Sequence, residues 1–329
     1  MATAASAHVL THGYCFDGIA SAAVFSRLLE HIEGRPLSFS FRSCGYGPKL
    51  KTIPNAWLGG DINAILDFRY TENERLSYYF DHHPTGFASP EERARAEAQV
   101  AASKGKRTLA YDPEATSCVK LIAAFAREAH GFDDPLLEPL VSWADRVDSA
   151  RFDDPEEAFF ALHPALSFAE VVERHGDTAF LNRWVPELWQ RPLADLADSP
   201  EIALLRQPLA AAKLEFLATL KQVGKLEGDI AVVDSSDKLV HPAGKFASYV
   251  AFPKARYSVA LMRTKDQLKL SVGFNPWSGL ERQHDIAAIC RREGGGGHAV
   301  VGAAAFAHAR IDEARAALSR VVSELSSSP

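Results

Sequence analysis

The tripeptide Asp81-His82-His83 follows directly after the mostly apolar segment 76–80, and it constrains the fold more than any other feature of the chain. A short segment of this kind is typical of a buried strand, so one carboxylate and two imidazoles would stand where the strand ends. In open α/β sheets ligands bind at the carboxyl ends of the strands, and both residue types bind metal ions. The tripeptide also suits a solvated turn in which the aspartate bonds nearby backbone groups.

Other apolar segments end in the same residue types. Segment 7–11 leads to His12, and Asp17 then precedes a helix, while segments 62–66 and 143–144 lead to Asp67 and Asp145. Carboxylates and imidazoles gathered from several segment ends are typical ligands of divalent metal ions. The pattern predicts a metal site built from His12, Asp17, Asp67, His82 and Asp145.

Each of these residues also has an ordinary alternative role. Asp17 could cap the helix that begins at Gly18, which is a common role of aspartate. Asp145 could form a surface ion pair with Arg146, and His12 could be an ordinary strand-end histidine. Their shared position at the ends of segments favours the metal site over these separate roles.

Strand-like and helix-like segments alternate through the first half of the chain. Alternation of this kind predicts βαβ units and an α/β fold with a mostly parallel N-terminal sheet flanked by helices. The charged, alanine-rich segment 89–106 suits an exposed helix or a mobile loop. We expect strands over residues 8–11, 37–41, 62–68 and 76–80, and helices over 18–32, 117–130 and 135–143.

Helical patterns interrupted by prolines dominate residues 155–224, and a smaller C-terminal α/β domain follows. In that domain we expect strands over 229–233, 257–262 and 268–274, the last two forming a hairpin, and helices over 243–250, 284–291 and 311–325. The predicted organisation is an N-terminal domain over residues 1–190, a helical linker over 191–226 and a C-terminal domain over 227–329.

The composition argues against several classes of protein. The formal net charge of −6 gives no general basic field for holding duplex DNA, whereas short anionic ligands at a metal site remain compatible. No segment has the length of a membrane span, and the N-terminus lacks the pattern of a signal peptide. The cysteines are scattered as reduced thiols would be, so we expect a cytoplasmic protein; they are Cys15, Cys44, Cys118 and Cys290.

Four consecutive glycines, 294–297, precede His298 and follow Arg291 and Arg292. Glycine backbones expose N–H groups and allow a ligand to approach closely, which suits anion binding. The alternative is a flexible linker, the commoner role of glycine runs. A helix-like segment before the run and the apolar segment 299–306 after it place the glycines within a folded unit.

With Asp81-His82-His83 near one end and Gly294–His298 near the other, the chain resembles the DHH phosphoesterases that carry a DHHA1 companion domain. The resemblance covers nearly the whole chain. It implies a metal-dependent phosphohydrolase, a phosphodiesterase or 3′-5′ exonuclease, that uses metal-activated water at a cleft between a DHH-like and a DHHA1-like domain. The alternatives are an exopolyphosphatase or pyrophosphatase-like enzyme and a non-catalytic nucleotide-binding protein.

The resemblance also implies roles for individual residues. Asp67 would bridge two divalent metal ions, with Mn²⁺ as the first choice and Mg²⁺ or Zn²⁺ as alternatives. Asp81 and His83 would serve catalysis, Asp81 by orienting its neighbours and His83 by facing the phosphate. The implied substrate-binding residues are Gly295, Gly296, Gly297, His298 and Arg292, with Asn275 as a further contact in a segment that lacks the family's arginine.

One motif departs from the common family pattern. Cys15 stands where the family usually has an aspartate, so the segment from His12 to Gly18 resembles a subset with a His-x-x-Cys-x-Asp-Gly motif. A thiolate would favour zinc or weaken a manganese site, or else Cys15 is a small buried apolar residue. The expected partner is a small phosphorylated substrate or a short single-stranded oligonucleotide, without duplex DNA or membrane. The sequence leaves the oligomeric state open, a homodimer included.

Overall fold

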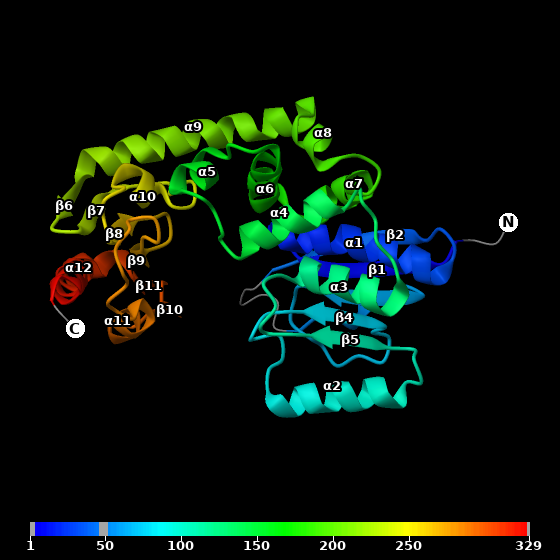
Figure 1. Cartoon of the computed structure of the whole chain (residues 1–329). Coiled ribbons are helices and arrows are strands. Elements are labelled where there is room, and N and C mark those ends of the chain that lie inside the picture. The colour runs from blue at the N-terminus through cyan, green and yellow to red at the C-terminus, as the bar shows by residue number, and fades with distance from the viewer. Residues whose placement is uncertain (1–3, 46–51, 328–329) are drawn as a thin grey trace. The chain divides into compact units, whose positions relative to one another are not determined.

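The computed structural model describes residues 4–45 and 52–327 and divides into two compact units (Figure 1). The C-terminal boundary between the units falls within helix α9 (Pro200–Val223). Within the described ranges, none of the helices combines the length and the apolar character that a membrane crossing requires. The units are Met1–Phe152 with His163–Arg206 (unit 1) and Asp153–Leu162 with Gln207–Pro329 (unit 2).

Unit 1 is built on one parallel sheet. Its strands are β1 (Ser6–His12), β2 (Ser38–Cys44), β3 (Ile62–Leu66), β4 (Tyr78–Asp81) and β5 (Thr108–Tyr111). They pair in the order β2-β1-β3-β4-β5, and every neighbouring pair runs parallel. The mostly parallel N-terminal sheet predicted from the alternating pattern is confirmed, and β1, β3 and β4 end side by side.

Helices cover both faces of this sheet. Successive residues of a strand point to opposite sides, so each strand packs against the helices on both faces. The helices of unit 1 are α1 (Phe16–Glu33), α2 (Pro90–Ala102), α3 (Cys118–His130), α4 (Glu138–Asp148), α6 (Pro164–His175), α7 (Thr178–Leu188) and α8 (Leu193–Ala197). On one face the ring of Phe80 lies 6.0 Å from Phe25 of α1 and 5.2 Å from Phe125 of α3. On the other face Tyr79 belongs to a core cluster with Ala96 of α2.

Unit 2 is built on a mixed sheet. Its strands are β6 (Gly224–Glu227), β7 (Ile230–Leu239), β8 (Tyr257–Arg263), β9 (Leu268–Phe274), β10 (Gly296–His298) and β11 (Val301–Phe306). They pair in the order β10-β11-β9-β8-β7-β6, with β7 and β8 parallel and the other neighbours antiparallel. The smaller C-terminal α/β fold and the hairpin of β8 and β9 are confirmed.

Two cores sandwich the sheet of unit 2. Val259 of β8 packs in a cluster with Leu318, whereas its neighbour Ala260 packs in a second cluster with Phe216. The remaining helices of unit 2 are α5 (Pro155–Phe160), α10 (Ala247–Ala251), α11 (Ile286–Arg292) and α12 (Ile311–Ser326). Helices α11 and α12 cover the first cluster, and α5, α9 and α10 cover the second.

Some predicted boundaries were wrong. The helix expected over 135–143 begins at Glu138 and continues to Asp148, so Asp145 lies inside α4 and not beyond it. Pro139 in the first turn explains the later start, because proline is tolerated there. Segment 89–106 contains the helix α2, capped by the Ser89 side chain. The exposed edge strand β6 has no apolar pattern, and the sequence did not predict it.

Gly18 allows the first turn of α1 to pack on the end of β1. A Cβ at this position would lie 2.1 Å from the carbonyl oxygen of His12. We expect Gly18→Ala to lower the free energy of unfolding by about 1–3 kcal/mol, the usual cost of overpacking, measured by denaturant titration. Gly45→Ala is the matched control, because a Cβ there meets nothing within 4 Å. An unchanged unfolding midpoint in Gly18→Ala would show that this packing tolerates a methyl group.

Candidate metal centre

Three neighbouring strands of unit 1 deliver polar residues to one edge of the sheet. His12 is the last residue of β1, Asp67 follows β3 directly, and His82 follows β4 directly. Since these strands are adjacent and parallel, their carboxyl ends meet at the same edge. The structure therefore brings these three predicted residues together.

Asp67 is the most buried of the three. Its side chain is 1% exposed, and neither carboxylate oxygen has a hydrogen-bond partner among the described residues. Imidazole nitrogens surround it: His12 Nδ1 lies 3.6 Å from Oδ2, while His82 Nε2 and His83 Nδ1 lie 3.5 and 3.6 Å from Oδ1. Burial acts to raise the pKa of Asp67, but the imidazoles outweigh it and hold the pKa below its usual range. Asp67 is thus a buried anion.

His82 is oriented as a metal ligand. Its Nδ1 lies 3.1 Å from the carbonyl oxygen of Ala115, an arrangement that keeps a proton on Nδ1 and turns Nε2 toward the cluster, where it can bind a metal ion once the ring is neutral. Nε2 is 3.4 Å from an oxygen of Asp148, 3.5 Å from Asp67 and 3.8 Å from Asp17. Burial disfavours the charged ring, but these carboxylates raise the pKa of His82 to about 9. Three carboxylates therefore converge on one imidazole nitrogen.

Asp17 does not cap its own helix. It lies in the first turn of α1, and its two oxygens accept hydrogen bonds from the backbone N–H groups of Cys118 and Val119, at 2.7 and 2.9 Å. Asp17 thereby holds the first turn of α3 against the site. Burial, with the nearby charges of Asp67 and Asp148, raises the pKa of Asp17 well above its usual range. A cation at this position would relieve that repulsion.

The structure does not bring Asp145 to this cluster. Its carboxylate accepts hydrogen bonds from the hydroxyls of Thr116 and Ser117, the latter at 2.8 Å, and pairs with Arg151 and Lys120. Despite partial burial, these bonds lower the pKa of Asp145. Asp148, one turn later in α4, takes the position beside His82 and Asp17 that the sequence assigned to Asp145. Sequence reasoning missed Asp148.

His83 and Asp81 form an oriented pair. Asp81 is fully buried and accepts a hydrogen bond from the Tyr79 hydroxyl at 2.9 Å, while His83 Nδ1 lies 2.8 Å from its other oxygen. Although burial acts in the opposite direction, Asp81 and Asp67 raise the pKa of His83. A Cβ at Gly86 would lie 2.2 Å from Asp81, so the loop after the motif closes tightly over this carboxylate.

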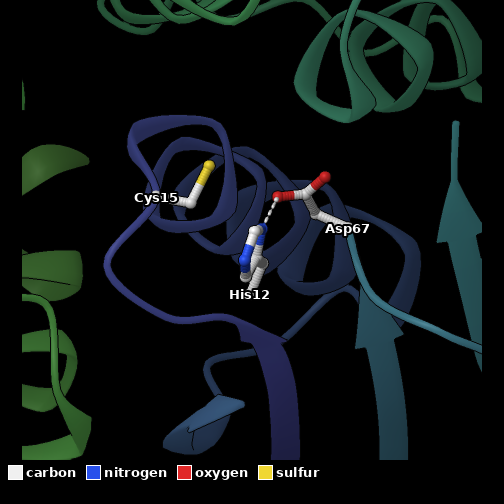
Figure 2. Close-up of side chains that lie close together, drawn as sticks. All are labelled: His12, Cys15 and Asp67. Atoms are coloured by element: carbon white, nitrogen blue, oxygen red, sulfur yellow. Dashed lines mark ion pairs between the residues drawn. The ribbon is translucent and has the colours of Figure 1, made fainter. Parts of the chain in front are cut away.

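Cys15 lies beside His12 and Asp67. One ligand atom each from His12, Cys15 and Asp67 lie within 4.8 Å of one another. Figure 2 shows Cys15 at the start of α1, beside the ion pair of His12 and Asp67. Burial, together with the charges of Asp67, Asp17 and Asp148, raises the pKa of the Cys15 thiol well above its usual range.

These residues fit divalent metal ions. The groups His12, Cys15, Asp67 and Asp17, His82, Asp148 each have ligand atoms close enough to hold one ion, and Asp67 also contacts His82 of the second group. The two Asp67 oxygens and His82 Nε2 are buried without hydrogen-bond partners among the described residues. Buried polar atoms in proteins normally have partners, and a bound metal ion can supply the partner that these atoms lack.

The predicted substrate-binding residues all lie in unit 2 and differ in their environments. A Cβ at Gly295 or Gly297 would lie 2.0 or 2.3 Å from backbone oxygens of β11, whereas at Gly296 it would meet nothing within 4 Å. His298 is exposed at the end of β10. Arg292 is exposed and forms an ion pair with Glu324.

Asn275, also in unit 2, has a structural role. It is fully buried, and its amide donates hydrogen bonds to the carbonyl oxygens of Pro253 and Ala255, at 3.2 and 2.9 Å. Its side-chain oxygen accepts a hydrogen bond from the backbone N–H of Trp277 at 3.1 Å. The amide is thus already occupied by the backbone.

Comparison with known proteins shows the fold. No family model matches the sequence, and no curated protein does either. The pGpG-specific phosphodiesterase PggH from Vibrio cholerae matches with a TM-score of 0.68 and 17% identity, covering 96% of this chain and 99% of that one. Exonuclease RecJ bound to manganese matches with a TM-score of 0.53 and 14% identity, covering 97% of this chain and 90% of that one. A DHH domain described as a member of the s1p family of ribosomal proteins matches with a TM-score of 0.58 and 14% identity, covering 98% of this chain and 87% of that one. The DHH-type fold implied by the motifs is confirmed.

The two aspartates of α4 provide a paired test of the site. We expect Asp148→Asn to weaken divalent metal binding, because the variant loses the carboxylate that groups with His82 and Asp17. The loss should exceed the roughly 10–100-fold that removal of an outer hydrogen-bond partner of a ligand costs. Asp145→Asn should keep the metal stoichiometry and lower the melting temperature, because Asp145 bonds the start of α3. Calorimetric metal titration and thermal unfolding measure both. The reverse pattern would restore Asp145 as the ligand.

Proposed function

We propose that this protein is a metal-dependent phosphodiesterase that hydrolyses small nucleotides or short single-stranded oligonucleotides. The observation that carries the proposal is Asp67, a buried carboxylate without hydrogen bonds among the described residues that contacts both groups of metal-competent side chains. The likeness of the fold to a pGpG-specific phosphodiesterase and to exonuclease RecJ supports the same reaction class.

The residues fit a centre of two divalent ions bridged by Asp67, with manganese as the first candidate since a RecJ structure is described as bound to manganese. Such ions, when bound, activate a water molecule and stabilise charge on a phosphate. Asp17 would provide an oxygen ligand while anchoring α3, and Asp148 would complete the set around His82. The site is thus proposed to consist of His12, Cys15, Asp17, Asp67, His82 and Asp148.

His83 is proposed to face the phosphate. Asp81 holds Nδ1 of the ring, so a substrate would be contacted through Nε2. The raised pKa favours the charged form of the ring, and a positive charge stabilises the anionic phosphate. Asp81 acts through His83 and is a positioning residue.

Aromatic side chains in unit 2 favour a nucleotide over an inorganic polyphosphate as substrate. Phe246 and Trp277 are half-buried, with ring centroids 5.0 Å apart at an interplanar angle of 81°. Nucleobases stack on such rings, and polyphosphate offers nothing to stack. His298 pairs with Val301, which pairs with Gly273 of the strand that leads into the Trp277 loop. The glycine segment and the aromatic pair therefore share one end of the sheet of unit 2.

Substitution of Asp67, the proposed bridging ligand, tests the proposed activity directly. We expect Asp67→Asn to abolish manganese-stimulated hydrolysis of the diester bis-p-nitrophenyl phosphate and to reduce bound metal below one equivalent per chain, because the variant loses the shared anionic ligand. Metal content by mass spectrometry and the initial rate check this. Turnover and full metal content in a folded Asp67→Asn protein would refute the site and the function built on it.

Substrate recognition is tested in unit 2. We expect Trp277→Ala and Gly296→Val each to raise KM for a dinucleotide, Trp277→Ala by about 5–150-fold because one stacked base contributes about 1–3 kcal/mol. Gly296 has room for a side chain, so a change there acts on the ligand and not on folding. Steady-state kinetics measure the effect.

Bis-p-nitrophenyl phosphate is the control substrate, because it carries no nucleobase and its hydrolysis should change much less. Equal losses of activity on both substrates would show that Trp277 and the glycine segment support the stability of the fold and not substrate recognition. Unchanged dinucleotide kinetics, with efficient hydrolysis of polyphosphate, would favour the exopolyphosphatase alternative.

A further inference from the structure

We infer that the two halves of the proposed centre prefer different metals. The half formed by His12, Cys15 and Asp67 selects a thiolate-binding ion of the zinc or cobalt class, and the half around Asp17, His82 and Asp148 selects manganese or magnesium. The inference deepens the proposed function, because it assigns the metal classes of the same centre.

The ligand atoms differ between the two halves. The first offers an imidazole nitrogen, a sulfur and a carboxylate oxygen within 4.8 Å of one another, a set that suits zinc and cobalt. The second offers two carboxylates and one imidazole, which suit harder ions. A thiolate and the Asp67 carboxylate together also balance the charge of one divalent ion.

Cys15 stands at the N-cap of α1 without capping the helix. It is the residue before the first turn of this 18-residue helix, and its side chain makes no capping hydrogen bond. Cysteine is not among the residues that cap helices well, so capping does not account for its presence. The side chain stands beside the buried Asp67 carboxylate, whose oxygens have no hydrogen-bond partner in the described part of the chain (Figure 2).

The other cysteines have a different environment. Cys44 and Cys290 belong to apolar core clusters, and Cys118 is fully buried with its sulfur 3.4 Å from the carbonyl oxygen of Phe80. Cys15 is the one that is not fully buried, and within the described residues it alone groups with an imidazole and a carboxylate at metal-binding distances. Its thiol is therefore placed for coordination and not for packing.

Cobalt(II) spectroscopy of the metal-stripped full-length protein tests the assignment without requiring turnover. We expect a sulfur-to-cobalt charge-transfer band in the near ultraviolet that saturates at one equivalent. Zn²⁺ should abolish the band by displacement, whereas equimolar Mn²⁺ should leave it. Cys15→Ser and Cys15→Asp should lose the band, and Cys15→Asp should retain bound Mn²⁺. Cys290→Ala, which changes a thiol in the core of unit 2, should keep it.

Protection from alkylation provides a second measurement that needs no variant. One equivalent of Zn²⁺ should protect Cys15 from iodoacetamide, as read by peptide mass spectrometry. Bound cobalt without the band, or alkylation of Cys15 at the same rate with and without Zn²⁺, would overturn the inference and leave the proposed hydrolysis intact. A band and protection in a protein that hydrolyses no diester would support the mixed site and refute the proposed function.

Discussion

The structure of unit 1 depends on one buried anion, the carboxylate of Asp67, placed where imidazoles from neighbouring strand ends can reach it. Removing an ion from water costs several kcal/mol unless opposite charge compensates it. Here the compensation comes from His12, His82 and His83 at 3.5–3.6 Å, distances that are longer than hydrogen bonds. The contacts are close enough for charge attraction and wide enough for an ion to be inserted. Asp67 also adopts a left-handed backbone, with φ of 55°, which is uncommon for a residue other than glycine and is typical of strained functional positions.

The rest of unit 1 holds this arrangement from outside. The parallel sheet fixes His12, Asp67 and His82 at adjacent strand ends, and the absence of a side chain at Gly18 lets α1 approach closely enough to present Cys15 and Asp17. Asp17 then bonds the free N–H groups of α3, so the same carboxylate that faces the site also positions the next helix. Because the proposed ligands lie within regular elements or directly next to them rather than in long loops, the geometry is set by the packing of the core.

Much of this follows from the sequence, and the exceptions have a physical cause. Strand-end residues such as Asp67 and His82 could be predicted, since an apolar segment reveals where a strand stops. The choice between Asp145 and Asp148 could not. The two are three residues apart on one helix and so share a face, and the start of α4 was predicted too early. Asp145 has a structural role because it accepts hydrogen bonds from the hydroxyls of Thr116 and Ser117, which are distant in the sequence. The backbone role of Asn275 is equally invisible to local pattern, because its partners lie 20 or more residues away.

The charges of the site explain how the fold can exist before it binds an ion. Asp17, Asp67 and Asp148 converge on one imidazole, and the three carboxylates would repel one another if all were ionised beside a neutral ring. The raised pKa values of Asp17 and His82 both act against this repulsion, because a proton on either group reduces the net negative charge of the cluster. A divalent ion can take the place of such protons, because both neutralise the same carboxylates. The parallel sheet and its helices already hold these groups together, so we expect metal uptake to release protons from the site rather than to fold it.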